Sequence, residues 1–282
     1  MKDVLLCTIG DDRFLRGCEV LLYSMQRNVP DLHEYPLKIY YDEKISSFSR
    51  ASRERLRQIT PHIEFEEVNC EVYRQVKIQV ESHRPSYLTL EVFRETEYRQ
   101  VLFFDTDMLC LRDFTDMFTL PEDYDFIACE AGRALGAGRW AEKEGRAEGR
   151  WARRKWFGLF GRRHAKINAG FFAVGRRFRN QRVYEDLLDI VRRRRNALSL
   201  DQWVINSYFG SRKTLLYFLP NEYNWRALDQ FDEAASKRVK LLHYTGFTHR
   251  SKPWEPDAPQ DLLAYRVWNQ YAEELHRQRA AA

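Results

Sequence analysis

The stretch Val101-Leu102-Phe103-Phe104-Asp105-Thr106-Asp107-Met108-Leu109-Cys110 places four apolar residues directly before two aspartates that are spaced by one residue. A run that is apolar on both faces is typical of a central strand, buried on both sides of a sheet. Ionised carboxylates are rarely buried without a partner, so the two aspartates lie at the mouth of this strand or face a cation. Both can face one hard divalent ion such as Mg²⁺ or Mn²⁺. A solvated turn, which shows the same short pattern by chance, is the alternative.

Apolar periodicity predicts alternating strands and helices on either side of this stretch. Before it, strands are expected at 4–8, 37–41 and 63–68, and helices at 16–28, 49–59 and 88–98. After it, strands are expected at 124–130, 167–174, 214–218 and 240–244, and helices at 179–195, 200–209 and 261–278. This order is typical of a parallel sheet with helices on its faces. We therefore expect an α/β fold with a single, Rossmann-like, mostly parallel sheet.

Length and composition favour one globular domain over residues 1–282. The chain is 44% hydrophobic and contains no internal repeat or low-complexity linker. No apolar run approaches the roughly 20 residues of a membrane helix, and the first ten residues resemble a strand rather than a signal peptide. The five cysteines are odd in number and lack metal-binding spacing, so we expect reduced thiols in a cytoplasmic protein.

Periodicity is lost in a basic insertion at about 132–165. From Arg139 to Lys166 there are ten Lys or Arg residues against three Glu, so the net positive charge is concentrated in this segment and the rest of the chain is slightly acidic. Three interpretations stay open: a solvated surface loop, a lid that meets a second substrate, and a peripheral membrane contact through 139–163. The last would place the protein at the inner face of a membrane.

Two rival classes use some of the same residues. Arginine clusters at 153–154 and 192–195 suggest a nucleic-acid-binding protein, but this charge is local and the second cluster ends a predicted helix, so we expect no nucleic acid. A metal-dependent hydrolase or nucleotidyltransferase would also use Asp105 and Asp107. It would not need Asn168, Gln202 and Lys252 together.

The first of three polar clusters follows the first predicted strand. Thr8, Ile9, Asp11 and Phe14 lie at a strand-to-helix turn, where polar groups can bind a nucleotide and an aromatic ring can stack on a base. The turn is not G-x-G-x-x-G, so dinucleotide binding is not supported. An ordinary connecting turn is the alternative.

The second cluster combines Asn168-Ala169-Gly170 with Asp201-Gln202. Amide side chains in apolar surroundings need hydrogen-bond partners, and sugar hydroxyls are suitable ones. A strand bulge at Gly170 is the alternative for Asn168.

The third cluster ends the last predicted strand. His243 follows an apolar run, and Lys252 follows nine residues later. Imidazole is acceptable to Mn²⁺ and Zn²⁺, and a lysine ammonium can neutralise a leaving diphosphate. A structural histidine at a strand end is the alternative.

These pieces, in this order, resemble glycosyltransferase family 8, which includes glycogenin and the bacterial lipopolysaccharide galactosyl- and glucosyltransferases. The resemblance covers nearly the whole chain. The matching stretches are Phe103-Phe104-Asp105-Thr106-Asp107, Ile167-Asn168-Ala169-Gly170-Phe171-Phe172, Leu200-Asp201-Gln202, Leu219-Pro220-Asn221-Glu222-Tyr223-Asn224, and His243-Tyr244-Thr245-Gly246 with Lys252-Pro253-Trp254.

The resemblance implies one domain of the GT-A fold that retains anomeric configuration. Its donor would be a UDP-sugar carrying a hexose, glucose or galactose, and its cofactor Mn²⁺ or Mg²⁺. The acceptor would be a glycan, a lipopolysaccharide, a lipid-linked sugar or a protein.

The resemblance also implies roles for individual residues. Asp105, Asp107 and His243 would hold the metal. Asp201, Gln202 and Lys252 would act in catalysis. The donor would contact Thr8, Ile9, Asp11, Phe14, Asp105, Thr106, Asn168, Ala169, Gly246 and Lys252.

The chain departs from the family pattern in two places. The family places a Lys or Arg near the position of Leu88 and Thr89, so Arg84 or Lys77 is the expected substitute. Gly246 and Lys252 are separated by five residues, more than in the family, so His249 or Arg250 can share the phosphate contact.

Overall fold

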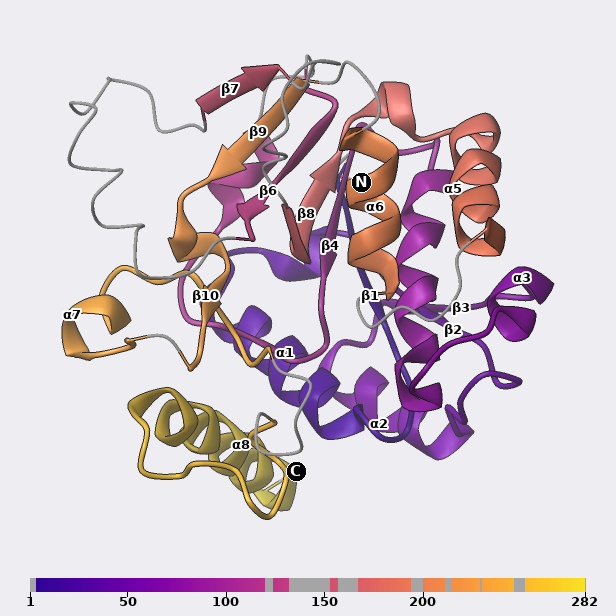
Figure 1. Ribbon diagram of the computed structural model, residues 1–282. Helices are drawn as coiled ribbons and strands as arrows, with labels where there is room; N and C mark the ends of the chain where they lie inside the picture. Colours follow the sequence, from indigo (N-terminus) through magenta and orange to yellow (C-terminus); the bar gives the residue numbers. More distant parts are fainter. Residues whose placement is uncertain are drawn as a thin grey trace.

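The structure is a computed structural model that describes residues 4–119, 124–131, 153–156, 167–193, 200–210, 215–228, 230–245 and 252–281 (Figure 1). Its centre is a large sheet with the strand order β3-β2-β1-β4-β8-β6-β9-β7. These strands are β1 (Val4–Ile9), β2 (Leu37–Tyr41), β3 (Ile63–Glu67), β4 (Gln100–Phe104), β6 (Phe126–Glu130), β7 (Arg153–Trp156), β8 (Ile167–Val174) and β9 (Leu215–Leu219).

The large sheet is parallel in its first half and mixed in its second. The pairs β3–β2, β2–β1, β1–β4 and β6–β9 are parallel, whereas β8 runs antiparallel to both β4 and β6. The expected parallel order therefore holds for the β-α-β units before Asp105, and the antiparallel β8 then fills the position beside β4.

A second, three-stranded sheet corrects the expectation of a single sheet. It has the order β10-β11-β5 and consists of β5 (Met108–Cys110), β10 (Trp225–Arg226) and β11 (Leu241–His243). The run from Val101 to Cys110 is thus two strands in two sheets, with Asp105 and Asp107 at the crossing. The last strand, which carries His243, belongs to the small sheet.

Helices cover both faces of the large sheet (Figure 1). One face carries α1 (Leu15–Asn28), α2 (Arg50–Ile59) and, packed on α1, α8 (Leu263–Ala281). The other carries α3 (Glu71–Gln75), the 3₁₀ helix η2 (Glu81–Arg94), α5 (Gln181–Arg193) and α6 (Leu200–Gly210). The short elements η1 (Leu32–Glu34), η3 (Thr115–Thr119), η5 (Arg176–Phe178), η6 (Asn221–Tyr223) and α7 (Glu233–Ser236) connect them.

Strand β4 is buried on both faces, as its sequence predicts. Leu102 and Phe104 belong to the core beneath α1, while Val101 and Phe103 belong to the core beneath η2 and α6. The ring of Phe103 stacks on Phe172 of β8 at a centroid distance of 5.1 Å. This aromatic packing fixes β8 against β4 at the end that leads to Asp105.

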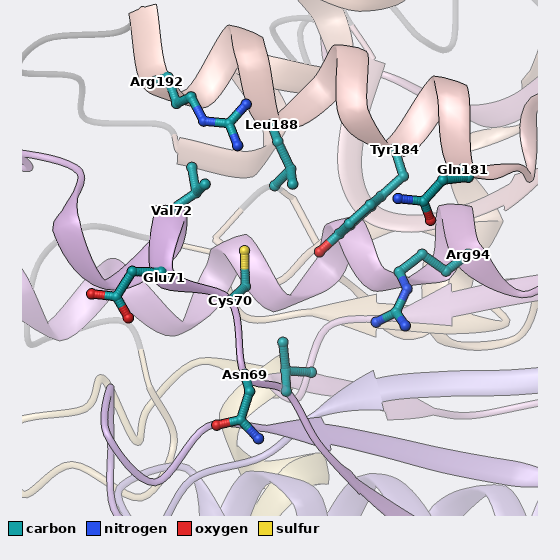
Figure 2. Close-up of a pocket in the computed structure, with 10 residues that line it drawn as sticks. Asn69, Cys70, Glu71, Val72, Arg94, Gln181, Tyr184, Leu188 and Arg192 are labelled. Carbon is teal, nitrogen blue, oxygen red and sulfur yellow. The ribbon is translucent and has the colours of Figure 1, made fainter.

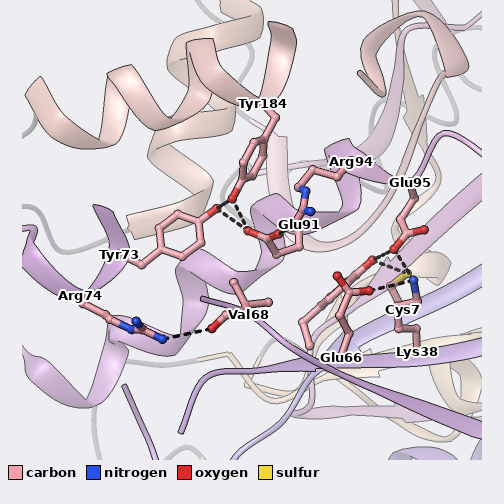
Figure 3. A network of polar contacts seen from close by, with 11 residues as sticks. Cys7, Lys38, Glu66, Val68, Tyr73, Arg74, Glu91, Arg94, Glu95 and Tyr184 are labelled. Carbon is pink, nitrogen blue, oxygen red and sulfur yellow. Dashed lines mark hydrogen bonds and ion pairs between the residues drawn. The ribbon is translucent and has the colours of Figure 1, made fainter. Parts of the chain in front are cut away.

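Buried polar side chains tie η2 to its neighbours (Figure 3). The carboxylate of Glu91 accepts hydrogen bonds from Tyr73 of α3 at 2.9 Å and from Tyr184 of α5 at 2.6 Å, and Arg94 pairs with it at 2.7 Å. Burial raises the pKa of Glu91, and the hydrogen bonds from these donors oppose that effect. They also satisfy the hydrogen-bonding capacity of the carboxylate inside the core. The network fixes η2 between the sheet and α5.

Several predicted boundaries differ from the structure. Helix η2 begins and ends earlier than the expected 88–98, and the C-terminal helix spans Leu263–Ala281 rather than 261–278. Within the basic insertion, 153–156 form strand β7, which pairs antiparallel with β9 and which the arginine-rich sequence did not predict. The rest of 132–165, and with it the lid and membrane interpretations, lies outside the described residues.

All five cysteines have free thiols, and Cys70 alone is not fully buried. Within the described ranges, none of the helices combines the length and apolar character that a bilayer crossing needs.

Replacing Phe103 by Ala should lower the free energy of unfolding by about 3–5 kcal/mol, because it leaves a cavity at the fully buried stack on Phe172. Urea denaturation measures this loss. Phe65→Ala on the edge strand β3 is the control, since that ring is only half-buried and should cost clearly less. Equal losses in the two variants would show that the β4–β8 contact is not central to the fold.

Candidate metal and donor site

The acidic pair lies where the chain passes from the large sheet to the small one. The backbone N–H of Asp105 donates to the carbonyl oxygen of Gly170 in β8 at 2.7 Å. The carbonyl oxygen of Asp107 accepts from the N–H of Tyr244 at 2.9 Å, and Met108 lies opposite His243 in the β5–β11 pair. Backbone bonds on both sides therefore bring the late His243 to the two aspartates.

Three side chains converge at this crossing. The Nε2 atom of His243 lies 3.1 Å from Oδ1 of Asp107 and 3.4 Å from Oδ2 of Asp105. One possible ligand atom from each of the three lies within 4.8 Å of the other two. The side chains of His243 and Asp107 are 4% and 9% exposed, whereas that of Asp105 is 30% exposed. Two carboxylate oxygens and one imidazole nitrogen are a donor set that fits Mn²⁺.

The site is electrostatically prepared for a cation. Burial opposes ionisation of Asp107, but the charges of Lys252 and His243 outweigh it and lower the pKa of Asp107. Burial likewise opposes protonation of His243, but Asp107 and Asp105 raise its pKa to about 9. Without an ion, a proton on His243 offsets part of the negative charge of the two carboxylates. A divalent ion bound between the three side chains would take over this role and displace the proton.

Lys252 supplies a second positive charge at this site. Its ammonium group pairs with Oδ2 of Asp107 and donates to the carbonyl oxygen of Tyr244 at 2.9 Å. It also lies 5.8 Å from the ring centroid of Phe14. The structure therefore brings Lys252 to the acidic pair, as the resemblance implies, while Gly246, His249 and Arg250 lie outside the described residues.

The polar cluster of β8 and α6 borders the acidic pair. The side-chain oxygen of Gln202 accepts from the N–H of Ala169 at 3.2 Å, which fixes the start of α6 against β8. Asp201, beside it, accepts from the side chain of Ser86, and burial together with the charge of Asp105 raises its pKa to about 7. Asn168, Ala169, Asp201 and Gln202 therefore lie together near Asp105.

The turn after β1 is held by its own aspartate. The buried carboxylate of Asp11 accepts from the N–H of Phe14 at 2.8 Å, from Arg13 at 2.7 Å and from Ser46 at 2.9 Å. Asp11 thus shapes the loop, and the sequence did not identify Arg13 and Ser46 as its partners. Thr8 is buried at the end of β1, with Ile9 next to it at the same strand end.

Phe14 joins this turn to the C-terminal part of the site. Its ring meets Trp254 edge-on at a centroid distance of 5.7 Å. Trp254 and the carbonyl oxygen of Thr106 both lie so close to Gly17 of α1 that a Cβ there would be 2.6 Å from each. Gly17 is the residue that lets α1, the acidic pair and the Trp254 loop meet.

The expected substitute for the family's basic residue is not found at Arg84. Its guanidinium pairs with Glu81 at 2.7 Å and donates to the carbonyl oxygens of Tyr73, Arg74 and Val76. It is therefore a structural residue that holds the segment before η2, and Lys77 is exposed.

A separate pocket of about 380 Å³ lies between α3, η2 and α5 (Figure 2). It is lined by Val68, Asn69, Cys70, Glu71, Val72, Arg94, Gln181, Tyr184, Leu188 and Arg192. None of these residues belongs to the acidic site.

The sequence matches the model of glycosyltransferase family 8 over residues 6–258. This chain belongs to glycosyltransferase family 8. Comparison with curated protein sequences gives no significant match.

Solved glycosyltransferase structures share the GT-A fold of this family 8 chain. An active-site variant of LgtC is 17% identical with a TM-score of 0.68, and the match covers 96% of this chain and 95% of that one. LgtC with donor and acceptor sugar analogues is 19% identical with a TM-score of 0.62, and coverage is again 96% and 95%. The bifunctional glycosyltransferase WbbM is 17% identical with a TM-score of 0.66, and this chain, covered over 97%, spans 51% of it. At these identities the likeness concerns the fold alone.

Replacing Gly170 by Ala should weaken Mn²⁺ binding about 10- to 100-fold, the usual effect of disturbing the support of a metal ligand. The added Cβ would lie 2.1 Å from Cε1 of His243 and displace the ring. Isothermal titration with Mn²⁺ measures the change. Gly175→Ala is the matched control, because its Cβ would meet the carbonyl oxygen of Tyr124 at 2.0 Å instead. Equal Mn²⁺ affinity in both variants would contradict the role of Gly170.

Replacing Asp201 by Asn should stabilise the metal-free protein more at pH 8 than at pH 5. The pKa of Asp201 is raised from 3.8 to about 7 in the folded state, so folding becomes less favourable as pH rises through this range. An amide does not ionise and avoids this loss.

Melting temperatures of variant and wild type at the two pH values measure the difference. The control is Asp189→Asn on α5, where the carboxylate is exposed and paired with Arg192. A Tm gain in Asp201→Asn that is the same at pH 5 and pH 8 would show that burial and the charge of Asp105 do not raise the pKa of Asp201.

Proposed function

We propose that this glycosyltransferase moves a hexose, glucose or galactose, from a UDP-sugar to an acceptor with retention of anomeric configuration and with Mn²⁺ or Mg²⁺ as cofactor. The observation that carries the proposal is the convergence of Asp105, Asp107 and His243, with Lys252 beside them. Two carboxylates, an imidazole and an ammonium group at one sheet edge suit a metal-bound diphosphate. The proposed acceptor is a glycan, a lipopolysaccharide, a lipid-linked sugar or a protein.

The bound ion would supply Lewis acidity at the diphosphate of the donor. Asp105, which is the more exposed of the two carboxylates, would hold the ion on the side of the substrate, while Asp107 and His243 hold it from inside. Lys252, which pairs with Asp107, would contact the diphosphate of the donor. Its charge would stabilise the leaving group as the glycosidic bond breaks.

Asp201 and Gln202 would act on the sugar. They lie at the start of α6, beside Asn168 and Ala169, on the same edge as the acidic pair. Positive charge develops at the anomeric carbon as the donor bond breaks, and a carboxylate near it is stabilising. We favour attack by the acceptor from the face that the diphosphate leaves, since this route gives retention without a second carboxylate nucleophile.

On this account UDP and Mn²⁺ together should raise the melting temperature by about 5–10 °C at 100 times the dissociation constant, and ATP or DNA should not. A screen of UDP-sugars with Mn²⁺ should detect UDP release. Asp105→Ala should lower this release at least about 100-fold with little loss of folding, because it removes one of the expected metal ligands.

The control is Asp189→Asn, a carboxylate of α5 outside the site, which should retain full activity. Full activity of Asp105→Ala in the presence of a chelator would end the metal proposal. Stabilisation by ATP rather than UDP would favour a different class of nucleotide enzyme.

A further inference from the structure

A chain of hydrogen bonds runs from the backbone of β8 to the imidazole of His243. It begins at the N–H of Gly170, which donates to the side-chain oxygen Oδ1 of Asn168 at 2.9 Å. A backbone N–H is always a donor, so the Asn168 atom that faces it has to be oxygen and not the amide nitrogen. This contact orients the whole Asn168 side chain.

The orientation of Asn168 determines that of Asn224. The same Oδ1 of Asn168 lies 2.7 Å from the side chain of Asn224, which therefore presents its Nδ2 donor. The other atom of the Asn224 amide, Oδ1, then lies 2.7 Å from Nδ1 of His243. Because Oδ1 is an acceptor, Nδ1 of His243 has to carry a proton. The lone pair of the neutral imidazole is then on Nε2, the atom that faces Asp105 and Asp107.

We propose that Asn224, oriented by Asn168, is a positioning residue that fixes the Nδ1–H form of His243 and so directs Nε2 toward the metal. This inference rests on the proposed function, since it assumes that His243 binds an ion. Hydrogen bonds to the second nitrogen of a ligating histidine commonly set its tautomer and orientation. Here the acceptor is an amide rather than a carboxylate, and a backbone N–H fixes its direction through a second amide.

We call the chain of hydrogen bonds from Gly170 through Asn168 and Asn224 to His243 the relay. The backbone around Asn224 keeps it in place. Asn224 directly precedes β10, which pairs in parallel with β11 so that Arg226 lies opposite His243. The N–H of Ala227 donates to the carbonyl oxygen of His243 at 2.8 Å. Both Asn224 and His243 are buried, at 6% and 4% exposed, so water does not readily replace the amide.

The relay also defines what Asn168 can offer a sugar. Its Oδ1 accepts two hydrogen bonds, one from Gly170 and one from Asn224. Both lone pairs of that oxygen are used. A hydroxyl group of the sugar would therefore accept a hydrogen bond from the Nδ2 group of Asn168.

The test compares Asn224→Leu and Asn168→Leu with a matched control, Asn206→Leu. Asn206 also makes partly buried hydrogen bonds at β8, where it accepts from the N–H of Ile167 and donates to the carbonyl oxygen of Ile167, but it lies outside the relay. All three variants lose amide hydrogen bonds in the same part of the fold. Only Asn224→Leu and Asn168→Leu should change the tautomer and orientation of the His243 ring.

Two readouts are used, the Mn²⁺ affinity by electron paramagnetic resonance and the ¹⁵N spectrum of the histidines in the Zn²⁺-loaded protein. A His243→Gln variant identifies the signal of His243. Wild type should show a protonated Nδ1 and a metal-bound Nε2. Asn224→Leu and Asn168→Leu should weaken Mn²⁺ binding about 10- to 100-fold and lose this single signal, while Asn206→Leu keeps both.

The outcomes separate this inference from the proposed function. If wild type binds Mn²⁺ through Nε2 but Asn224→Leu and Asn168→Leu match it in affinity and signal, the relay is wrong and the metal site stands. A wild-type signal with bare Nδ1 would also overturn the relay. If wild type does not bind Mn²⁺, the metal proposal fails, and with it the inference that Asn224 directs Nε2 of His243 toward a metal.

Discussion

The site depends on the close approach of the β8 backbone at Gly170 to the end of β4 and to the ring of His243. The carbonyl oxygen of Gly170 accepts from Asp105, its N–H donates to Asn168, and its Cα leaves no room for a side chain beneath the imidazole. One residue thus fixes the first carboxylate, the relay and the place of the ring. Aromatic stacking of Phe103 on Phe172 keeps β8 at the distance that these contacts need.

Charge compensation explains how a family 8 chain can hold one buried and one partly exposed carboxylate at a sheet edge. Asp107 has a lowered pKa and His243 a raised one because each compensates the charge of the other, and Lys252 adds a further positive charge. The cluster is stable only as a group, since a buried charge without its partner is costly. The site is therefore formed without a ligand, with a lysine and an imidazolium where, on the proposed function, a metal and a diphosphate would bring their own charges.

Much of the site could be predicted from the sequence, and the reasons are local. The apolar run before Asp105 predicted a strand buried on both faces, and Leu102 and Phe103 are indeed on opposite cores. The small sheet could not be predicted. A strand was expected at 240–244, where β11 lies, but β5 and β10 have only three and two residues, so no periodicity separates them as strands of a second sheet. Strand β7 is likewise hidden, since its sequence Arg-Arg-Lys-Trp does not alternate. Asn224 was part of a recognised stretch, but its contact with His243 depends on how β10 and β11 pair.

The most direct test of the metal site is a crystal of the protein soaked in Mn²⁺ and UDP and measured at the manganese absorption edge. The account predicts an anomalous peak bounded by Asp105, Asp107 and Nε2 of His243, with the diphosphate on the side of Asp105 and in contact with Lys252. A nucleotide bound at this edge without a peak between the three side chains, or a peak elsewhere in the molecule, would contradict it.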